Sequence, residues 1–237
     1  IAASVLFMVC GVMVLAAGFL WALRNAVFAI GGITVGGDVA HNNAVTLRAN
    51  VAPQISGNFF TVNLRNVRSA FEQVPWVRSA QVRREYPRTL RVQLQEHRAV
   101  AHWGPESGSS MVNSEGEVFE SNGVDAELDD LPRLMGPVGT SEQVLAMEQA
   151  LLPVFEPLGL ELSGLELSTR GGWRASFDGD AAIELGSGTP PEVVQRTRNF
   201  AETLTRVAAQ FGRRADALES ADLRHTGGYA LRLRGVS

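Results

Sequence analysis

Residues 77–95 read VRSAQVRREYPRTLRVQLQ, and this stretch decides the fold of the first soluble part of the chain. Two runs, Val77–Arg84 and Thr89–Gln95, flank a short turn that contains a proline. Strict alternation of apolar and polar residues is typical of a half-buried strand. In the second run the alternating apolar residues are Leu90, Val92 and Leu94. The stretch therefore predicts a β-hairpin with one apolar face.

Two helices and a short strand are predicted on the N-terminal side of this hairpin. Leu64–Val74 carries an apolar stripe at helical spacing, and Asn63 can cap its first turn by accepting a hydrogen bond from a backbone amide. A second helix is predicted over Asn43–Val51, with Asn42 or Asn43 as its cap. With a strand at Ile33–Val35, the order β-α-α-β-β over residues 33–98 predicts a compact two-layer unit.

Residues 1–23, IAASVLFMVCGVMVLAAGFLWAL, contain no charged residue and no histidine. A bilayer core requires about 20 apolar residues in a helix. The run therefore predicts a membrane-spanning anchor in the lipid bilayer, with Trp21 at the interface and Arg24 just beyond it. The apolar part of a cleaved signal peptide is shorter, and the pattern of a buried amphipathic helix is absent. Because the sequence begins with Ile1, we expect a cytoplasmic segment before it, and charge alone leaves the orientation open.

Residues 24–32 are predicted to form a linker. The glycines at positions 31, 32, 36 and 37 do not have the spacing of a phosphate-binding loop. We interpret them as a flexible exit from the membrane.

The second soluble block, residues 99–237, is predicted to be a β domain with an antiparallel sheet and two flanking helices, so the fold class is α+β. One helix begins after Thr140. The other begins at Thr189, which has the capping-box spacing to Glu192, and its predicted apolar stripe runs from Val193 to Phe211. Eight short strands are predicted, at Val100–Trp103, Met111–Asn113, Glu117–Phe119, Leu165–Ser168, Trp173–Phe177, Ala182–Leu185, Leu218–Arg224 and Tyr229–Leu233.

Composition and motifs give no support for catalysis or nucleic-acid binding. All 21 basic residues are arginine, but the formal net charge is −4, so the chain as a whole is not a basic nucleic-acid binder. Cys10, the single cysteine, lies in the anchor, and the four histidines form no HExxH motif. No GxSxG motif is present. We therefore expect no catalytic residue, no cofactor, no metal site and no nucleic-acid partner.

Several short motifs follow one another from the end of the first block to the C-terminal region. They are VPWV (Val74–Val77), AQVRREYP (Ala80–Pro87), EHRAVAHW (Glu96–Trp103), NSEGEVF (Asn113–Phe119), LPRLMGP (Leu131–Pro137), RGGW (Arg170–Trp173), IELG (Ile183–Gly186) and ADLRH (Ala221–His225). In this order, and with the N-terminal anchor before them, they resemble the motifs of the bacterial FtsQ/DivIB family.

The resemblance implies a single-pass protein of the cell inner membrane, with a cytoplasmic N-terminus, periplasmic domains and a place at the division septum. The first block would be a POTRA domain and the second the β domain of the family. Its function would be that of a non-enzymatic divisome scaffold that links early and late division proteins and helps control septal peptidoglycan synthesis. FtsB and FtsL would be the main partners, with FtsK, FtsW, FtsI and FtsN as further ones.

The resemblance also implies where FtsB would bind. FtsB would add a strand beside the last strand of the β domain, which is β-augmentation. The last strand of the β domain would be Tyr229-Ala230-Leu231-Arg232-Leu233, and it follows a turn that contains Gly227 and Gly228. Arg170 matches a family arginine that forms a salt bridge with FtsB, and Arg224 and His225 match the end of the DLRY motif. His225 and Leu233 depart from the family, which has aromatic residues there.

Two other classes of function remain open. A transport or outer-membrane assembly component would also contain POTRA units, but it would carry repeats of them or a C-terminal barrel with many alternating strands of about ten residues. A membrane-tethered enzyme would require a reactive cluster of side chains. The sequence shows neither pattern.

Overall fold

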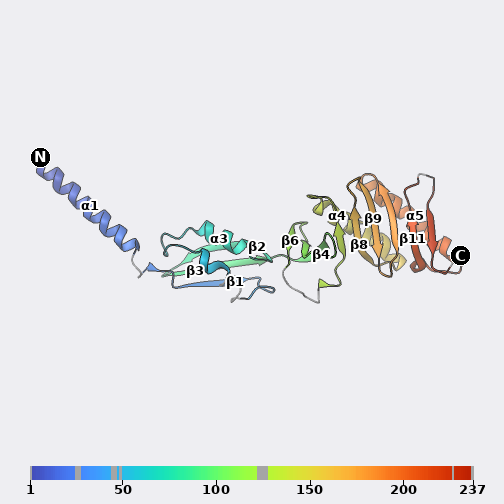
Figure 1. Ribbon diagram of the computed structural model, residues 1–237, viewed down its shortest axis with the longest axis horizontal. Coiled ribbons are helices and arrows are strands. Elements are labelled where there is room, and N and C mark those ends of the chain that lie inside the picture. The colour runs from blue at the N-terminus through green and yellow to red at the C-terminus, as the bar shows by residue number, and fades with distance from the viewer. Residues whose placement is uncertain are drawn as a thin grey trace. The chain divides into compact units, whose positions relative to one another are not determined.

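The computed structural model describes residues 2–24, 28–43, 47, 50–121, 128–225 and 227–235. It begins with a long apolar helix, α1 (Ala2–Arg24), and divides into two compact units (Figure 1). The first unit comprises Ile1–His97 and the second Arg98–Ser237.

Helix α1 is long enough to cross a bilayer. Its 23 residues span about 34 Å at the helical rise, and a hydrocarbon core is about 30 Å thick. The apolar stretch Ala3–Trp21 packs against nothing in the protein, so its side chains are available to lipid. The length and exposure of α1 agree with the predicted anchor.

The first unit contains a three-stranded sheet with helix α3 (Leu64–Glu72) packed on it. The sheet order is β1-β3-β2, and these strands are β1 (Gly32–Gly37), β2 (Val77–Glu85) and β3 (Thr89–Glu96). The predicted hairpin is confirmed, with β2 and β3 antiparallel and Val82 opposite Val92. Asn63 caps α3 as predicted, because its side chain accepts a hydrogen bond of 3.0 Å from the amide of Arg65.

The interpretation of the glycines as a flexible exit is wrong for Gly32, Gly36 and Gly37. They belong to β1, which runs parallel to β3 and pairs Gly32 with Thr89 and Gly37 with Leu94. Glycine weakens a strand, but the ladder with β3 supplies the order that the local sequence lacks. Of the helix predicted over Asn43–Val51, only residues 43, 47, 50 and 51 are described, the last three of them as helical, and the others lie outside the described residues.

The core of the first unit lies between α3 and the sheet. Phe71 of α3 packs with the alternating residues of β3, and a short 3-10 helix, η2 (Ala52–Gln54), lies near α3. The apolar face predicted for β3 is confirmed, since its three apolar residues are all buried. Those residues are Leu90, Val92 and Leu94.

The second unit is built on one nine-stranded sheet in the order β12-β11-β10-β9-β8-β7-β4-β5-β6. The sheet is mixed and not wholly antiparallel as predicted. The parallel neighbours are β4 with β7, β7 with β8, and β10 with β11. The strands are β4 (Ala99–Trp103), β5 (Ser110–Asn113), β6 (Val118–Glu120), β7 (Arg133–Met135), β8 (Leu162–Leu167), β9 (Gly172–Phe177), β10 (Ala182–Ser187), β11 (Leu218–Asp222) and β12 (Ala230–Leu233).

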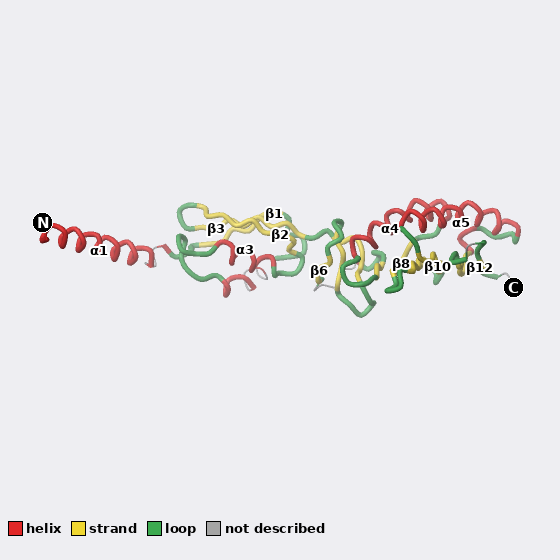
Figure 2. Tube along the Cα trace, turned by 90° about the horizontal axis from the view of Figure 1, so that it is seen from above, coloured by secondary structure: helices red, strands yellow, loops and turns green. Residues whose placement is uncertain are grey.

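Two of the three parallel pairs are connected through helices, and these two helices pack on one face of this sheet. Helix α4 (Ser141–Phe155) connects β7 to β8, and α5 (Pro190–Gln210) connects β10 to β11. Parallel neighbours require such crossover connections. Figure 2 shows both helices on the same side of the strands, and among the described residues of this unit no α-helix lies on the opposite face. Two 3-10 turns, η4 (Glu156–Leu158) and η5 (Ala215–Ala217), follow the helices.

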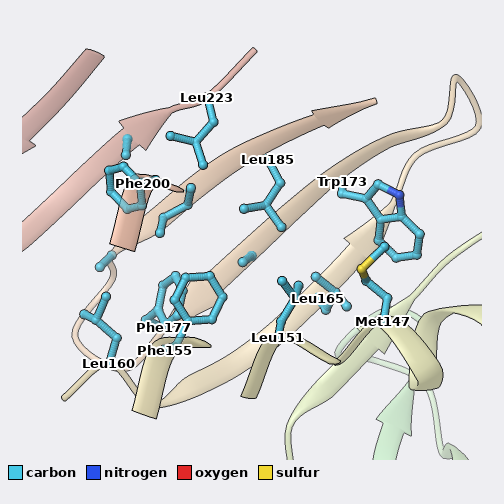
Figure 3. Packing of buried hydrophobic residues seen from close by; sticks show 14 of the residues in the cluster. Met147, Leu151, Phe155, Leu160, Leu165, Trp173, Phe177, Leu185, Phe200 and Leu223 are labelled. Carbon is cyan, nitrogen blue, oxygen red and sulfur yellow. The ribbon is translucent and has the colours of Figure 1, made fainter. Parts of the chain in front are cut away.

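The core of the second unit fills the layer between these helices and the sheet (Figure 3). Phe155 of α4 meets Phe177 of β9 edge to face, with ring centroids 4.7 Å apart. From α5, Phe200 and Leu204 enter the core. The predicted α5 stripe is wrong at its end, because Phe211 is exposed and Ala208 is the buried residue of that turn.

Both predicted helix starts are close to the observed ones. The capping box at Thr189 is confirmed, with its amide donating to the Glu192 carboxylate at 2.8 Å. Thr140 precedes α4, but its hydroxyl donates to the Pro137 carbonyl at 2.7 Å and does not cap the helix. Strand β7 was not predicted, because its three residues are too few to show a period.

Adjacent leucines on α4 give a matched test of this core. Leu151 is fully buried, whereas Leu152 is 43% exposed. Leu151→Ala is expected to lower the free energy of unfolding by about 2–5 kcal/mol, because it leaves a cavity. Leu152→Ala is expected to change it by less than about 1 kcal/mol. Urea unfolding of the second unit, monitored by near-UV circular dichroism, measures both free energies. An equal decrease in the free energy of unfolding for the two variants would contradict the packing described.

Candidate partner-binding edge

Strand β12 is one edge of the nine-stranded sheet. It pairs with β11 in the antiparallel direction, with Ala221 opposite Leu231 and Asp222 opposite Ala230. The expected edge position of the last strand is thus confirmed. An edge strand exposes a row of backbone donors and acceptors on which another chain can pair.

The register shows which backbone groups of β12 face outward. In an antiparallel ladder, the N–H and C=O groups of one residue point to the same neighbouring strand, and those of the next residue point to the opposite side. The amide of Arg234 donates to the Ala217 carbonyl at 2.8 Å, so the even-numbered residues of β12 bond to β11. The amide of Leu223, the residue after β11, donates to the Glu184 carbonyl of β10. Because neighbouring residues of a strand direct their backbone groups to opposite sides, the backbone groups of Asp222 face β12. The N–H and C=O groups of Leu231 and Leu233 therefore point to the open edge.

The apolar side chains of this segment face the helix layer. Leu233 is buried, and Leu231 and Tyr229 pack against the core. The Tyr229 ring meets Phe200 edge to face at 4.9 Å, and its hydroxyl lies 2.7 Å from the Thr203 hydroxyl. Tyr229 lies just before β12 and anchors the edge strand to α5. The edge is therefore held in place by packing at Leu233 and Tyr229, while Ala230, Leu231 and Arg232 keep some exposure to solvent.

The outward side chains near the turn before β12 are polar or small. His225, Gly227 and Gly228 are exposed, and Ala230 and Arg232 lie on the exposed face of β12. The guanidinium of Arg232 is 3.5 Å from Glu219 on β11. Surface pairs of this kind contribute little to stability, so Arg232 can exchange partners.

Arg224 is held by a carboxylate of its own strand region. Its guanidinium donates to both carboxylate oxygens of Asp222, and the shortest of these contacts is 2.6 Å. This side-chain pairing, with a further bond from the Arg224 amide, lowers the pKa of Asp222 to about 2 and raises the pKa of Arg224. Asp222 therefore stays ionised at neutral pH and offsets the charge of Arg224.

Arg170 lies in the tight turn between β8 and β9. The turn is closed by Ser168, whose amide donates to the Gly172 carbonyl at 2.8 Å and whose hydroxyl accepts from the Gly172 amide at 2.9 Å. The Arg170 side chain is exposed, and within the described part of the chain it has no ion-pair partner. Arg174 and Arg224, in contrast, each lie beside a carboxylate, that of Glu184 and that of Asp222.

A groove of about 610 Å³ brings four arginines together at the ends of β9 and β10. Two of them, Arg170 and Arg224, are among the residues expected from the family resemblance. Arg174 and Arg196 were missed, because they come from β9 and α5 and only the fold unites them. Arg196 donates to the carbonyls of Leu185 and Ser187, which fixes its position.

This groove continues toward the edge strand. A second groove of about 390 Å³ shares Arg174 and Glu184 with it and is lined by Ala230, Leu231 and Arg232. Arg174 and Glu184 are 3.6 Å apart. The arginines and the open edge therefore belong to one continuous surface.

The local charge of this surface is opposite to that of its unit. Residues 98–237 contain 12 arginines and 21 carboxylates, a formal charge of −9, whereas the larger groove has four arginines and only two glutamates. Complementary charge steers and aligns binding partners. The surface can therefore pair an added strand at its edge and accept a carboxylate beside it.

Comparison with known families assigns both units. The model of the FtsQ-type POTRA domain matches residues 28–97. The model described as "Cell division protein FtsQ/DivIB, C-terminal" matches residues 101–224 and ends before β12.

Curated relatives match over most of their length. A cell division protein FtsQ from Burkholderia pseudomallei is 36% identical over 241 residues, which cover 100% of this chain and 92% of the relative. The FtsQ protein from Thiomonas arsenitoxydans is 35% identical, covering 91% of this chain and 79% of the relative. The FtsQ protein from Bordetella pertussis is 33% identical, covering 92% and 85%. With its apolar N-terminal helix and these two domains, the chain belongs to the FtsQ/DivIB family of cell-division proteins.

Proposed function

We propose that this protein is a non-enzymatic divisome scaffold that binds FtsB, and with it FtsL, at the open edge of β12. The observation that carries the proposal is the outward backbone of the half-buried Leu231, which lies beside the arginine-lined groove. An added strand gains main-chain hydrogen bonds at such an edge, and neighbouring side chains select its sequence.

The groove supplies the selective part of this interaction. A carboxylate of the FtsB segment pairs with Arg170, which forms no ion pair with the described residues, and Arg174 and Arg224 add to the positive field. Tyr229 acts through packing, since its hydroxyl and ring are engaged by α5. His225, Gly227 and Gly228 form the exposed turn that the added strand passes.

The same proposal includes the place of the protein in the cell. The N-terminus lies in the cytoplasm, α1 crosses the inner membrane, and both units lie in the periplasm at the division septum. There the scaffold links early and late division proteins, among them FtsK, FtsW, FtsI and FtsN, and helps control septal peptidoglycan synthesis. Family membership and α1 support a single-pass division protein. Midcell fluorescence of a tagged protein tests the location, and a uniform membrane signal would contradict it.

Strand addition is tested by a pair of substitutions at one position. Leu231→Pro removes the outward N–H group, which proline lacks, whereas Leu231→Ala keeps that N–H and removes most of the side chain. We expect Leu231→Pro to weaken binding of the FtsB periplasmic segment by about 10- to 100-fold, or about 1.4–2.7 kcal/mol. Leu231→Ala should weaken it much less. Isothermal titration calorimetry gives both Kd values, and equal affinities for the two variants would exclude strand addition at this edge.

The role of the groove is tested by charge reversal. Arg170→Glu is expected to weaken FtsB binding by about 10-fold or more, because it places a negative charge opposite the partner's carboxylate. Arg198→Glu is the matched control, since Arg198 is exposed on α5 and does not line the groove, and the net charge changes equally. Arg224→Glu should have the smaller effect of the two groove variants, because Asp222 already offsets Arg224. Equal Kd values for Arg170→Glu and Arg198→Glu would remove the groove from the proposal.

The clamp between Asp222 and Arg224 has a predicted pH dependence. Because the folded pKa of Asp222 is about 2, below its ordinary value of 3.8, the clamp stabilises the fold fully above about pH 4. This contribution is lost as the pH falls from 3.8 towards 2. In a carboxyl NMR titration, Asp222 should have its midpoint near 2 in the wild type and closer to 3.8 in Arg224→Gln. An unchanged midpoint in the variant would show that Arg224 does not hold the carboxylate.

A further inference from the structure

The two units carry opposite charge. Residues 1–97 contain nine arginines and four carboxylates, a formal charge of +5, against −9 for residues 98–237. The excess of arginine thus belongs to the unit that contains α1. Positive charge near a membrane is attracted by anionic lipid headgroups.

One end of the first unit contacts Phe28 and Gly31, which follow the anchor helix in the chain. The amide of Phe59 donates to the carbonyl of Phe28 at 2.9 Å, and the rings of Phe28 and Phe60 meet edge to face at 5.2 Å. Arg84 donates to the carbonyls of Phe59 and Val62, at 2.7 and 2.8 Å. These bonds tie the loop that carries Phe60 to the end of the β2–β3 hairpin.

The turn of that hairpin lies at the same end. The amide of Gly31 donates to the carbonyl of Arg88 at 2.8 Å, and the next residue, Gly32, pairs with Thr89. Tyr86 stands at the tip of this turn and is 85% exposed. Phe60, in the loop tied to the hairpin, is 49% exposed. Two aromatic side chains and the arginines at positions 84 and 88 therefore surround the exit segment.

The covalent chain keeps this end near the bilayer. Helix α1 ends at Arg24, and Phe28 follows four residues later, so the two lie at most about 14 Å apart. The helix itself uses its length to cross the hydrocarbon core. The end of the unit that is bonded to Phe28 must therefore stay at the level of the headgroups or just outside them.

We propose that this end of the POTRA domain, here called the membrane-proximal face and defined by Phe28, Phe60, Arg84, Tyr86 and Arg88, docks on an anionic phospholipid surface. Tyrosine and arginine are suited to this site, because tyrosine favours the membrane interface and the positive charge of arginine attracts anionic headgroups, also where its donors bond to carbonyls of the protein. The contact would fix the tilt of the domain on its anchor. The FtsB-binding edge, at the other end of the chain, is not needed for it.

Electron paramagnetic resonance of the full chain in lipid nanodiscs tests this contact. In a Cys10→Ala background, single cysteines replace Tyr86, Phe60 or Val39 and carry a nitroxide. Val39 is the matched control, because it is exposed and follows β1 at the end opposite the turn. The ratio of collisions with oxygen to collisions with a water-soluble nickel chelate reports the depth of each label in the bilayer.

In nanodiscs with phosphatidylglycerol, positions 86 and 60 should show a ratio several-fold higher than position 39. In nanodiscs of phosphatidylcholine alone, or at 0.5 M salt, which shortens the screening length to below about 5 Å, the ratio should fall toward that of position 39. Equal ratios at all three positions in phosphatidylglycerol would overturn the proposal. Ratios as high in phosphatidylcholine as in phosphatidylglycerol would show that the contact does not require anionic lipid. Labels that become protected from the nickel chelate only after a protein partner is added would exclude lipid as the occupant.

Discussion

The burial of the helix-covered face of strands β7 to β12 is the constraint on which the second unit depends. Helices α4 and α5 both arise from crossovers between parallel strands, and both pack on the same side. The main core therefore lies on one face of these strands, and Leu233 of β12 and Tyr229 just before it pack into that core. Because this packing and the ladder with β11 hold β12 in place, the outward backbone groups of Leu231 can pair with an added strand.

The two units also differ in charge. The first unit is basic and is attached to the anchor, whereas the second is acidic apart from the groove formed by Arg170 and its neighbours. Tethering to a membrane confines partners to a thin layer and raises their effective concentration. A surface of moderate affinity is then sufficient, which agrees with an interaction built from main-chain bonds and a few exposed charges.

Much of the fold follows from the sequence, but only where local pattern and tertiary structure agree. The alternating apolar residues of β3 predicted this strand, because they are the residues that it buries. Asn63 predicted the start of α3, because its side chain caps the helix through a local hydrogen bond. The strand at Ile33–Val35 was predicted, but the glycines on either side of it were misinterpreted, since their strand conformation comes from the ladder with β3. The short β7 has one buried residue, Leu134, and shows no period. At the candidate site, Arg170 and Arg224 were named through family resemblance, whereas Arg174 and Arg196 meet them only through folding.

The most direct test of the central claim is residue-resolved amide hydrogen exchange of β12 with and without the FtsB segment. The claim predicts that the outward amide of Leu231 exchanges quickly in the free protein and becomes strongly protected in the complex. The amide of Arg232, which faces β11, should already be protected and change little. Binding that leaves the Leu231 amide as exposed to exchange as before would contradict strand addition at this edge.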